Sequence, residues 1–132
     1  MTIKSLKTLK TVLAVAAISL TGALATEQAS AANLAPTEVT IQAESGGDFF
    51  GYVHSSNSSC DANRKVTLFK MVGSTPDRHV DKKVASDIAQ PNGPDGMWAT
   101  GNTGLRKGKF YARVGKTSLC GADISPVVKA LP

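Results

Sequence analysis

The chain has 132 residues, a formal net charge of +5 and 42% hydrophobic residues. This length suits one domain, and the apolar residues do not recur in the long runs of a multi-span membrane protein. Residues 1–31 hold three of the lysines and one acid, which leaves 12 basic against 9 acidic residues in the rest. That excess is too small for a dedicated nucleic-acid-binding protein, so we expect no nucleic-acid partner.

The N-terminal segment, residues 1–31, has the three parts of a secretory signal peptide. Lysines without an acid come first, an apolar run of nine follows at residues 12–20, and small residues follow Gly22. The run is too short for a stable membrane anchor. Cleavage after Ala31 is favoured, with Ala25 as the other site, and a buried N-terminal helix is the alternative. We therefore expect a signal helix, then secretion to an extracellular or periplasmic location, in a style that resembles bacterial signals.

After an expected short linker at residues 32–37, apolar and polar side chains alternate in short segments separated by turns. No segment of residues 38–132 has the apolar spacing of a helix over three turns. The alternating segments are residues 39–43, 48–55, 64–72, 84–88, 97–100, 109–114 and 124–130. Seven short strands predict an all-β domain, an antiparallel sandwich of immunoglobulin-like or prealbumin-like type; a barrel is the alternative closure.

Alternation also predicts which side chains share a face of each strand. The apolar residues expected on one face of their own strand are Phe49, Gly51 and Val53 in the first of these strands, Val66 and Leu68 in the second, and Phe110, Ala112 and Val114 in the third. Trp98, in a strand beside a turn, is expected in the core. Two polar segments containing proline and glycine, residues 73–83 and 91–96, are predicted to be an exposed loop and a turn.

The only cysteines, Cys60 and Cys120, are expected to form one disulfide. A lone pair of cysteines in an exported protein is most simply a bridge. Cys60 comes just before the strand at residues 64–72, and Cys120 comes just after the strand at residues 109–114. If these strands are antiparallel neighbours, as the third and sixth strands of a seven-strand sandwich are, the two cysteines meet. A free reactive or metal-binding pair is the alternative.

Four short motifs follow one another in an order that resembles the prealbumin-like, or carboxypeptidase-regulatory-like, β-sandwich family. They are residues 51–53 (GYV), 65–69 (KVTLF), 95–98 (DGMW) and 108–114 (GKFYARV). The chain departs from that pattern in its cysteine pair, in its long loop and in lacking Gly-Ala before the second strand. It is more similar to small exported bacterial proteins of unassigned function built on this sandwich. The resemblance implies an accessory, adhesive or structural module and supplies no catalytic residues.

Residues able to carry out chemistry are few. His54 and His79 are the only candidate general bases, and both are interpreted as solvated side chains. The serine cluster Ser55, Ser56, Ser58 and Ser59 lacks the motifs of nucleophilic hydrolases and is interpreted as a turn. Asp48, Asp87 and Asp95 lie near strand ends but lack a calcium-loop spacing. We expect no catalytic residue, no metal site and no cofactor.

One surface has a pattern that favours binding. If Phe110, Ala112 and Val114 point inward, alternate positions of the two central strands point outward. The candidate binding face is Lys65, Phe69, Lys109, Tyr111 and Arg113, with Arg106, Lys107 and Lys116 at its margins. Outward cations that merely keep a sheet soluble are the plain interpretation. The functional interpretation is a docking surface for an anionic partner, in which the rings supply contact area.

We therefore expect an exported, non-enzymatic β-sandwich module that binds or builds structure at the cell surface or in the secretome. Its partner would be an anionic cell-wall polymer or an extracellular protein. The alternative is an inhibitor of an extracellular hydrolase that presents residues 73–83 or 91–96. A hydrolase is a third hypothesis, which needs His54 and His79 beside a carboxylate in a concave site.

Overall fold

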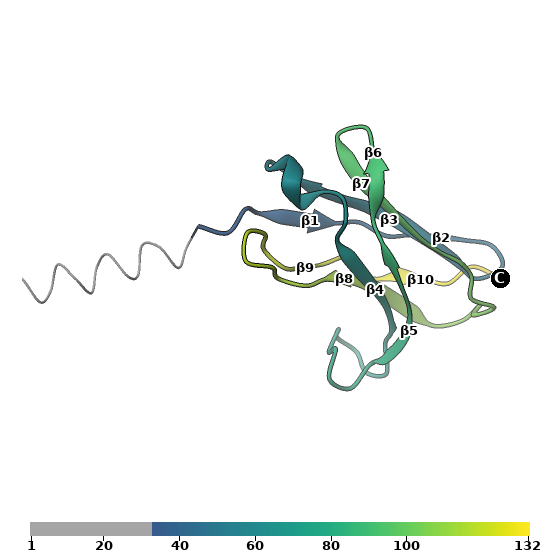
Figure 1. The fold of residues 1–132 in the computed structure, drawn as a ribbon. Coiled ribbons are helices and arrows are strands. Elements are labelled where there is room, and N and C mark those ends of the chain that lie inside the picture. The colour runs from purple at the N-terminus through teal and green to yellow at the C-terminus, as the bar shows by residue number, and fades with distance from the viewer. Residues whose placement is uncertain (1–32) are drawn as a thin grey trace, which may run out of the picture. The chain divides into compact units, whose positions relative to one another are not determined.

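The computed structural model describes residues 33–132, which form two antiparallel β-sheets (Figure 1). The predicted signal peptide at residues 1–31 lies outside the described part of the chain. The only helix among residues 33–132 is the 3-10 turn η2, Ser58–Cys60, so none is long and apolar enough to cross a membrane. The prediction of an all-β domain with two antiparallel sheets is confirmed.

The first sheet has the strand order β1-β3-β7-β6, and β2 pairs with β3 beyond the end of β1. Its strands are β1 (Thr37–Val39), β2 (Gln42–Glu44), β3 (Asp48–Ser55), β6 (Gln90–Asn92) and β7 (Asp95–Asn102). The second sheet has the order β10-β8-β4-β5, and β9 pairs with β8. Its strands are β4 (Lys65–Lys70), β5 (Lys82–Ile88), β8 (Lys109–Val114), β9 (Asp123–Ile124) and β10 (Val128–Lys129).

The strands at residues 48–55 and 109–114 have the predicted bounds, whereas the first and last predicted strands are each divided in two. At the first division the Thr40 hydroxyl accepts from the Tyr52 amide, and the Thr40 carbonyl accepts from the Trp98 indole. At the last division Pro126 has no amide to donate, and the Ser125 hydroxyl accepts from the Ala112 amide instead. Side chains therefore replace ladder hydrogen bonds at both breaks.

The core lies between the sheets and contains the inner faces predicted from alternation. Its buried side chains are Val39, Ile41, Phe49, Val53, Val66, Leu68, Ala89, Trp98, Phe110, Ala112 and Val114. Phe49 of the first sheet packs on Phe110 of the second, with ring centroids 4.6 Å apart. Gly51 lets β3 approach the Thr40 bend, because a Cβ there would stand 2.0 Å from the Thr40 carbonyl oxygen.

The predicted disulfide joins Cys60 to Cys120, with 5.6 Å between their Cα atoms. The strand pairing behind that prediction is also present, since β4 and β8 are antiparallel neighbours and Leu68 lies opposite Ala112. Residues 34–36, which the sequence assigned to a linker, are hydrogen-bonded to the chain on either side of Cys120. The Ala35 amide donates to the Leu119 carbonyl, and the Ala35 carbonyl accepts from the Gly121 amide.

Arg64, one residue before β4, is buried and makes hydrogen bonds to the segments around the disulfide. Its side chain is 4% exposed, and its guanidinium makes four hydrogen bonds of 2.7–3.1 Å. The acceptors are the Thr37 hydroxyl and the carbonyls of Cys60, Gly115 and Gly121. Residues 34–132 form one compact unit that contains both sheets, the core and the disulfide. We expect this unit to fold without the residues before it, so it is the form of the protein to use in binding and stability measurements.

Candidate functional site

The predicted binding face belongs to the outer side of the second sheet. In the β4–β8 pair Thr67 lies opposite Arg113 and Phe69 lies opposite Tyr111, so these side chains share one face as expected. Lys65 and Lys109 are exposed and Arg113 is partly exposed. The two rings, however, are buried: Phe69 is 7% exposed and Tyr111 is fully buried. The expectation that both rings offer contact area to a partner was therefore wrong.

The connection between β4 and β5 makes a buried contact on this face, which explains the burial of Tyr111. Phe69 and Tyr111 are stacked at 5.3 Å, and the Tyr111 hydroxyl donates to Asp81 Oδ2 at 2.8 Å. Burial, and then this hydrogen bond to Asp81, raise the pKa of Tyr111. Of the exposed loop predicted at residues 73–83, residues 73–80 are exposed, whereas Asp81 is buried and Lys82 and Lys83 begin β5.

Asp81 fixes the loop of residues 71–81 to the sheet. Its carboxylate accepts from the Asp77 and Val72 amides at 2.7 and 2.8 Å, in addition to the Tyr111 hydroxyl. The Asp77 amide, the Val72 amide and the Tyr111 hydroxyl lower the pKa of Asp81. Because this pKa lies below the value of an unfolded aspartate, the carboxylate's contribution is present above about pH 4 and is lost as the pH falls through the lowered pKa.

Two grooves meet at Arg113 on this face. The first, which we call the basic groove, has a volume of about 390 Å³. It is lined by Asn63, Arg64, Lys65, Thr67, Arg113, Gly115, Lys116 and Thr117. The second, the loop groove, has a volume of about 670 Å³ and lies between the 71–81 loop and β9. It is lined by Thr75, Pro76, Asp77, Arg78, Arg113, Ala122, Asp123 and Ile124.

The basic groove contains cations and no acid. Lys65, Arg113 and Lys116 make no side-chain hydrogen bond or ion pair with any residue from 33 to 132. Arg64 lines the groove, but carbonyl and hydroxyl oxygens already occupy its guanidinium. Three charged groups around one groove produce a positive potential, which attracts anions and offers them hydrogen-bond donors.

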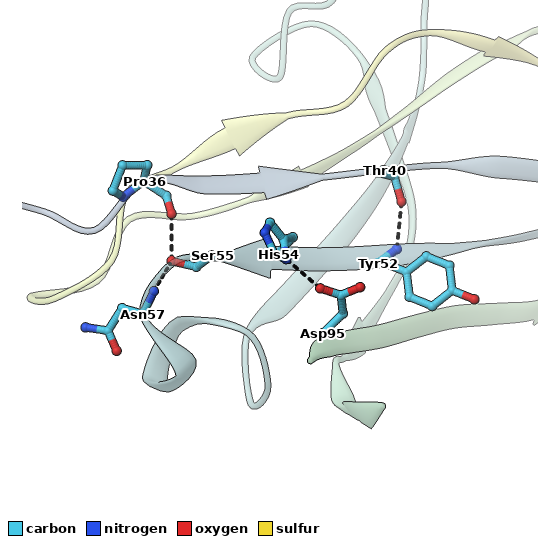
Figure 2. A network of polar contacts seen from close by, with 7 residues as sticks. All are labelled: Pro36, Thr40, Tyr52, His54, Ser55, Asn57 and Asp95. Carbon is cyan, nitrogen blue, oxygen red and sulfur yellow. Dashed lines mark hydrogen bonds and ion pairs between the residues drawn. The ribbon is translucent and has the colours of Figure 1, made fainter. Parts of the chain in front are cut away.

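A second polar group lies on the outer face of the first sheet. His54 Nδ1 is 2.6 Å from Asp95 Oδ1, and Figure 2 shows the imidazole turned toward that carboxylate. The hydrogen bond with Asp95 is the main reason why the pKa of His54 is raised. The histidine borders a groove of about 560 Å³ together with Pro36, Thr37, Glu38, Ser55, Ser56 and Asp123.

His54, Asp95 and the neighbouring serine do not form a nucleophilic triad. Successive residues of a strand point to opposite faces, and the Ser55 side chain is buried while His54 is exposed. The Ser55 hydroxyl donates to the Pro36 carbonyl at 2.7 Å and accepts from the Asn57 amide (Figure 2). His79 lies in the 71–81 loop and lines none of the groove around His54.

The acidic residues considered for calcium have other contacts. Asp87 accepts from the Ala99 amide at 2.9 Å, and Asp95 is paired with His54. In the part of the chain that the structure describes, no three His, Cys, Asp or Glu side chains are arranged to hold a metal ion.

Arg64 and Arg78 were absent from the predicted site residues. Alternation offered a signal for Arg64, because it precedes Val66 and Leu68 at the same spacing and therefore shares their inward face. Arg78 had no such signal, since its place beside Arg113 depends on how the 71–81 loop folds back.

Three comparisons with known proteins were made: with family models, with curated proteins and with solved structures. None of them found a match for this chain.

Proposed function

We propose that this chain is an exported, non-enzymatic binding module that takes an anionic partner in the basic groove. We further propose that its sandwich is of the immunoglobulin-like or prealbumin-like type. The strand order supports that assignment: β1-β3-β7-β6 corresponds to the A-B-E-D sheet of such folds, and β4, β8 and β9–β10 correspond to C, F and G. The disulfide is compatible with an oxidising extracellular or periplasmic location.

The observation that carries the proposal is the set of unpaired cations around the basic groove. Surface lysines and arginines usually alternate with acids, but this groove of about 390 Å³ contains none. Arg113 also borders the loop groove, where Arg78 adds a further cation and Asp77 and Asp123 add two acids. The acid-free basic groove, with Lys65, Arg113 and Lys116, is therefore the part of this face that favours a polyanion. An acidic cell-wall polymer has this chemistry.

Reversing the groove charges tests the proposal. We expect Lys65→Glu/Arg113→Glu/Lys116→Glu to bind immobilised polyphosphate about 100-fold more weakly, because each reversal replaces an attraction by a repulsion of roughly 1 kcal/mol. Retention should be measured at about 50 mM salt, where screening is limited.

The matched control is Arg106→Glu/Lys107→Glu/Lys129→Glu, which changes the net charge equally at exposed positions outside the groove. The control should keep most of its affinity. Equal losses in the two triple variants would mean that only net charge matters, and the groove would not be a site.

The second candidate function, inhibition of an extracellular hydrolase, is favoured by one observation. Asp81 holds the 71–81 loop to the sheet through three accepted hydrogen bonds. A preorganised loop loses less conformational entropy when it enters an active site. The β6–β7 turn is the other exposed loop, and Asp95 at its end is paired with His54.

Removing the Asp81 carboxylate should release the loop. We expect trypsin to cleave Asp81→Ala after Arg78 at least about tenfold faster than the unchanged protein, because three hydrogen bonds are lost together. Tyr111→Phe removes only one of them and should show a smaller increase. Mass spectrometry of the fragments identifies the cleaved bond. An unchanged rate in Asp81→Ala would show that other contacts order the loop.

A further inference from the structure

The two sheets carry opposite charges. The strands of the first sheet contain neither lysine nor arginine, and their acids are Glu38, Glu44, Asp48 and Asp95, of which Asp95 is paired with His54. The strands of the second sheet contain seven cations and two acids. The cations are Lys65, Lys70, Lys82, Lys83, Lys109, Arg113 and Lys129. The net excess of three positive charges in residues 33–132 therefore hides a strong separation of charge.

The two acids of the second sheet make hydrogen bonds to the first sheet. Asp87 accepts from the Ala99 amide of β7, and Asp123 accepts from the Val39 amide of β1. Both carboxylates thus link the two layers, and Asp123 also lines the loop groove beside Arg113. Away from that groove, the exposed strand charges on the outer face of the second sheet are the cations Lys65, Lys83, Lys109 and Lys129.

Like charges also stand directly opposite each other within each sheet. Glu44 of β2 faces Asp48 of β3, and Lys109 of β8 faces Lys129 of β10. Such pairs destabilise a sheet because the side chains lie about 5 Å apart. One Asp48 oxygen, Oδ1, is buried and has no partner among the described residues. An opposite charge from outside the molecule would relieve the repulsion in both sheets.

The first sheet's outer face combines its acids with larger side chains. Phe50, Tyr52 and Met97 are partly exposed, and Tyr52 lies opposite Met97 in the β3–β7 pair. Glu38 lies opposite His54 at one end of this face, and Glu44 lies at the other. We call this outer side of the first sheet the acidic face, and the outer side of the second sheet the basic face.

We propose that the acidic face of one copy of this protein docks on the basic face of a second copy. Charge complementarity favours a second copy as the partner, because each copy carries acids on one face and cations on the other. The two docking surfaces are different, so the contact is heterologous and each docked pair still has one free face of each kind. The expected product is a short open stack whose length grows with concentration.

The size of the faces indicates weak association. Four strands about 4.8 Å apart, with the longest about 27 Å in length, give a face of roughly 500 Å². Stable interfaces bury about 800 Å² on each partner, so the contact should be reversible. It should also depend strongly on salt, because the Debye length falls from about 30 Å at 0.01 M to about 8 Å at 0.15 M salt.

Charge reversal on one face at a time provides the test. The acidic-face variant is Glu38→Lys/Glu44→Lys, and the basic-face variant is Lys65→Glu/Lys109→Glu; all four side chains are exposed. Two of the changes convert a like-charge pair into an opposite-charge pair, so both variants should fold. Sedimentation velocity at about 0.01 M salt should give a mass that rises with concentration for the unchanged protein and the monomer mass for each variant.

Mixing the variants distinguishes this arrangement from other modes of association. In an equimolar mixture, the intact basic face of the acidic-face variant meets the intact acidic face of the basic-face variant. The mixture should therefore form dimers and stop there. Arg106→Glu/Lys107→Glu changes the net charge as the basic-face variant does, but outside the strands, and should still associate.

Three results would overturn the proposal: a monomer mass for the unchanged protein at about 0.01 M salt, association of either variant alone, or a monomeric mixture. The proposal does not rest on the proposed function. The acidic-face variant keeps the basic groove intact, so its retention on polyphosphate reports on that function separately. If both proposals hold, added polyphosphate dissociates the stacks because it occupies the basic face.

Discussion

Replacing Arg64 with alanine is expected to lower the free energy of unfolding by about 4 kcal/mol, since hydrogen bonds to a charged group contribute roughly 1.5–3 kcal/mol each and are not additive. The side chain is 4% exposed, and its guanidinium joins η2, the β8–β9 connection and β1. Its removal leaves three carbonyls and the Thr37 hydroxyl without these donors. Urea denaturation of residues 34–132 measures the loss.

Two further variants separate the hydrogen bonds from the charge. Arg64→Lys keeps the charge but cannot direct a planar fork of donors at four acceptors, so it should lose about half as much. Arg113→Ala removes an arginine that bonds to no residue from 33 to 132, and it should cost less than about 1 kcal/mol. If Arg64→Ala cost no more than Arg113→Ala, the buried guanidinium would contribute little to stability.

Loss of the disulfide is the second large effect. The bridge closes a loop with a sequence separation of 60 residues, and its removal should cost about 4 kcal/mol in the chain-entropy model. This is a large part of the 5–15 kcal/mol that a domain usually has. Cys60→Ala, Cys120→Ala and the double variant should lose similar amounts, because either single change removes the same bond. Denaturation with and without a thiol reductant checks the result; a midpoint that the reductant does not move would contradict it.

The disulfide and Arg64 stabilise the same junction, so their effects should not add. The guanidinium binds the carbonyl of Cys60 itself and the carbonyl of Gly121, which follows Cys120. When the bridge is absent, these acceptors can separate and the arginine loses part of its environment. A double-mutant cycle between Arg64→Ala and Cys120→Ala measures this coupling directly.

Local alternation predicted the strands and their inner faces where the chain is regular. Phe49 and Val53 on β3, and Phe110 and Val114 on β8, are buried as the period of two requires. The pairing of β4 with β8 followed from the positions of the cysteines. The breaks between β1 and β2 at Thr40, and between β9 and β10 at Pro126, were not predicted. At each break a side chain replaces a ladder hydrogen bond, and the spacing of apolar residues carries no information about such a replacement.

The candidate site was predicted in part. Lys65 and Arg113 are brought to one groove, as the shared face of β4 and β8 implied. The burial of Phe69 and Tyr111 could not be predicted from alternation, since it depends on Asp81, which lies 30 residues before Tyr111 and returns to the sheet at the end of a loop. Alternation predicts which face of the sheet a ring lies on, but it does not predict whether a loop from elsewhere in the chain covers that face.

The sequence by itself determined the all-β character, the inward faces of the long strands and the cysteine bridge, because each follows from the local order of side chains or from a single pair of residues. Only the tertiary structure decided how the charges are distributed. Four of the six strand acids lie on strands that precede and follow β4 and β5 in the chain, yet pairing gathers these four in one sheet and all the strand lysines in the other. That sorting arises from contacts between segments far apart in the chain, which neither composition nor periodicity contains.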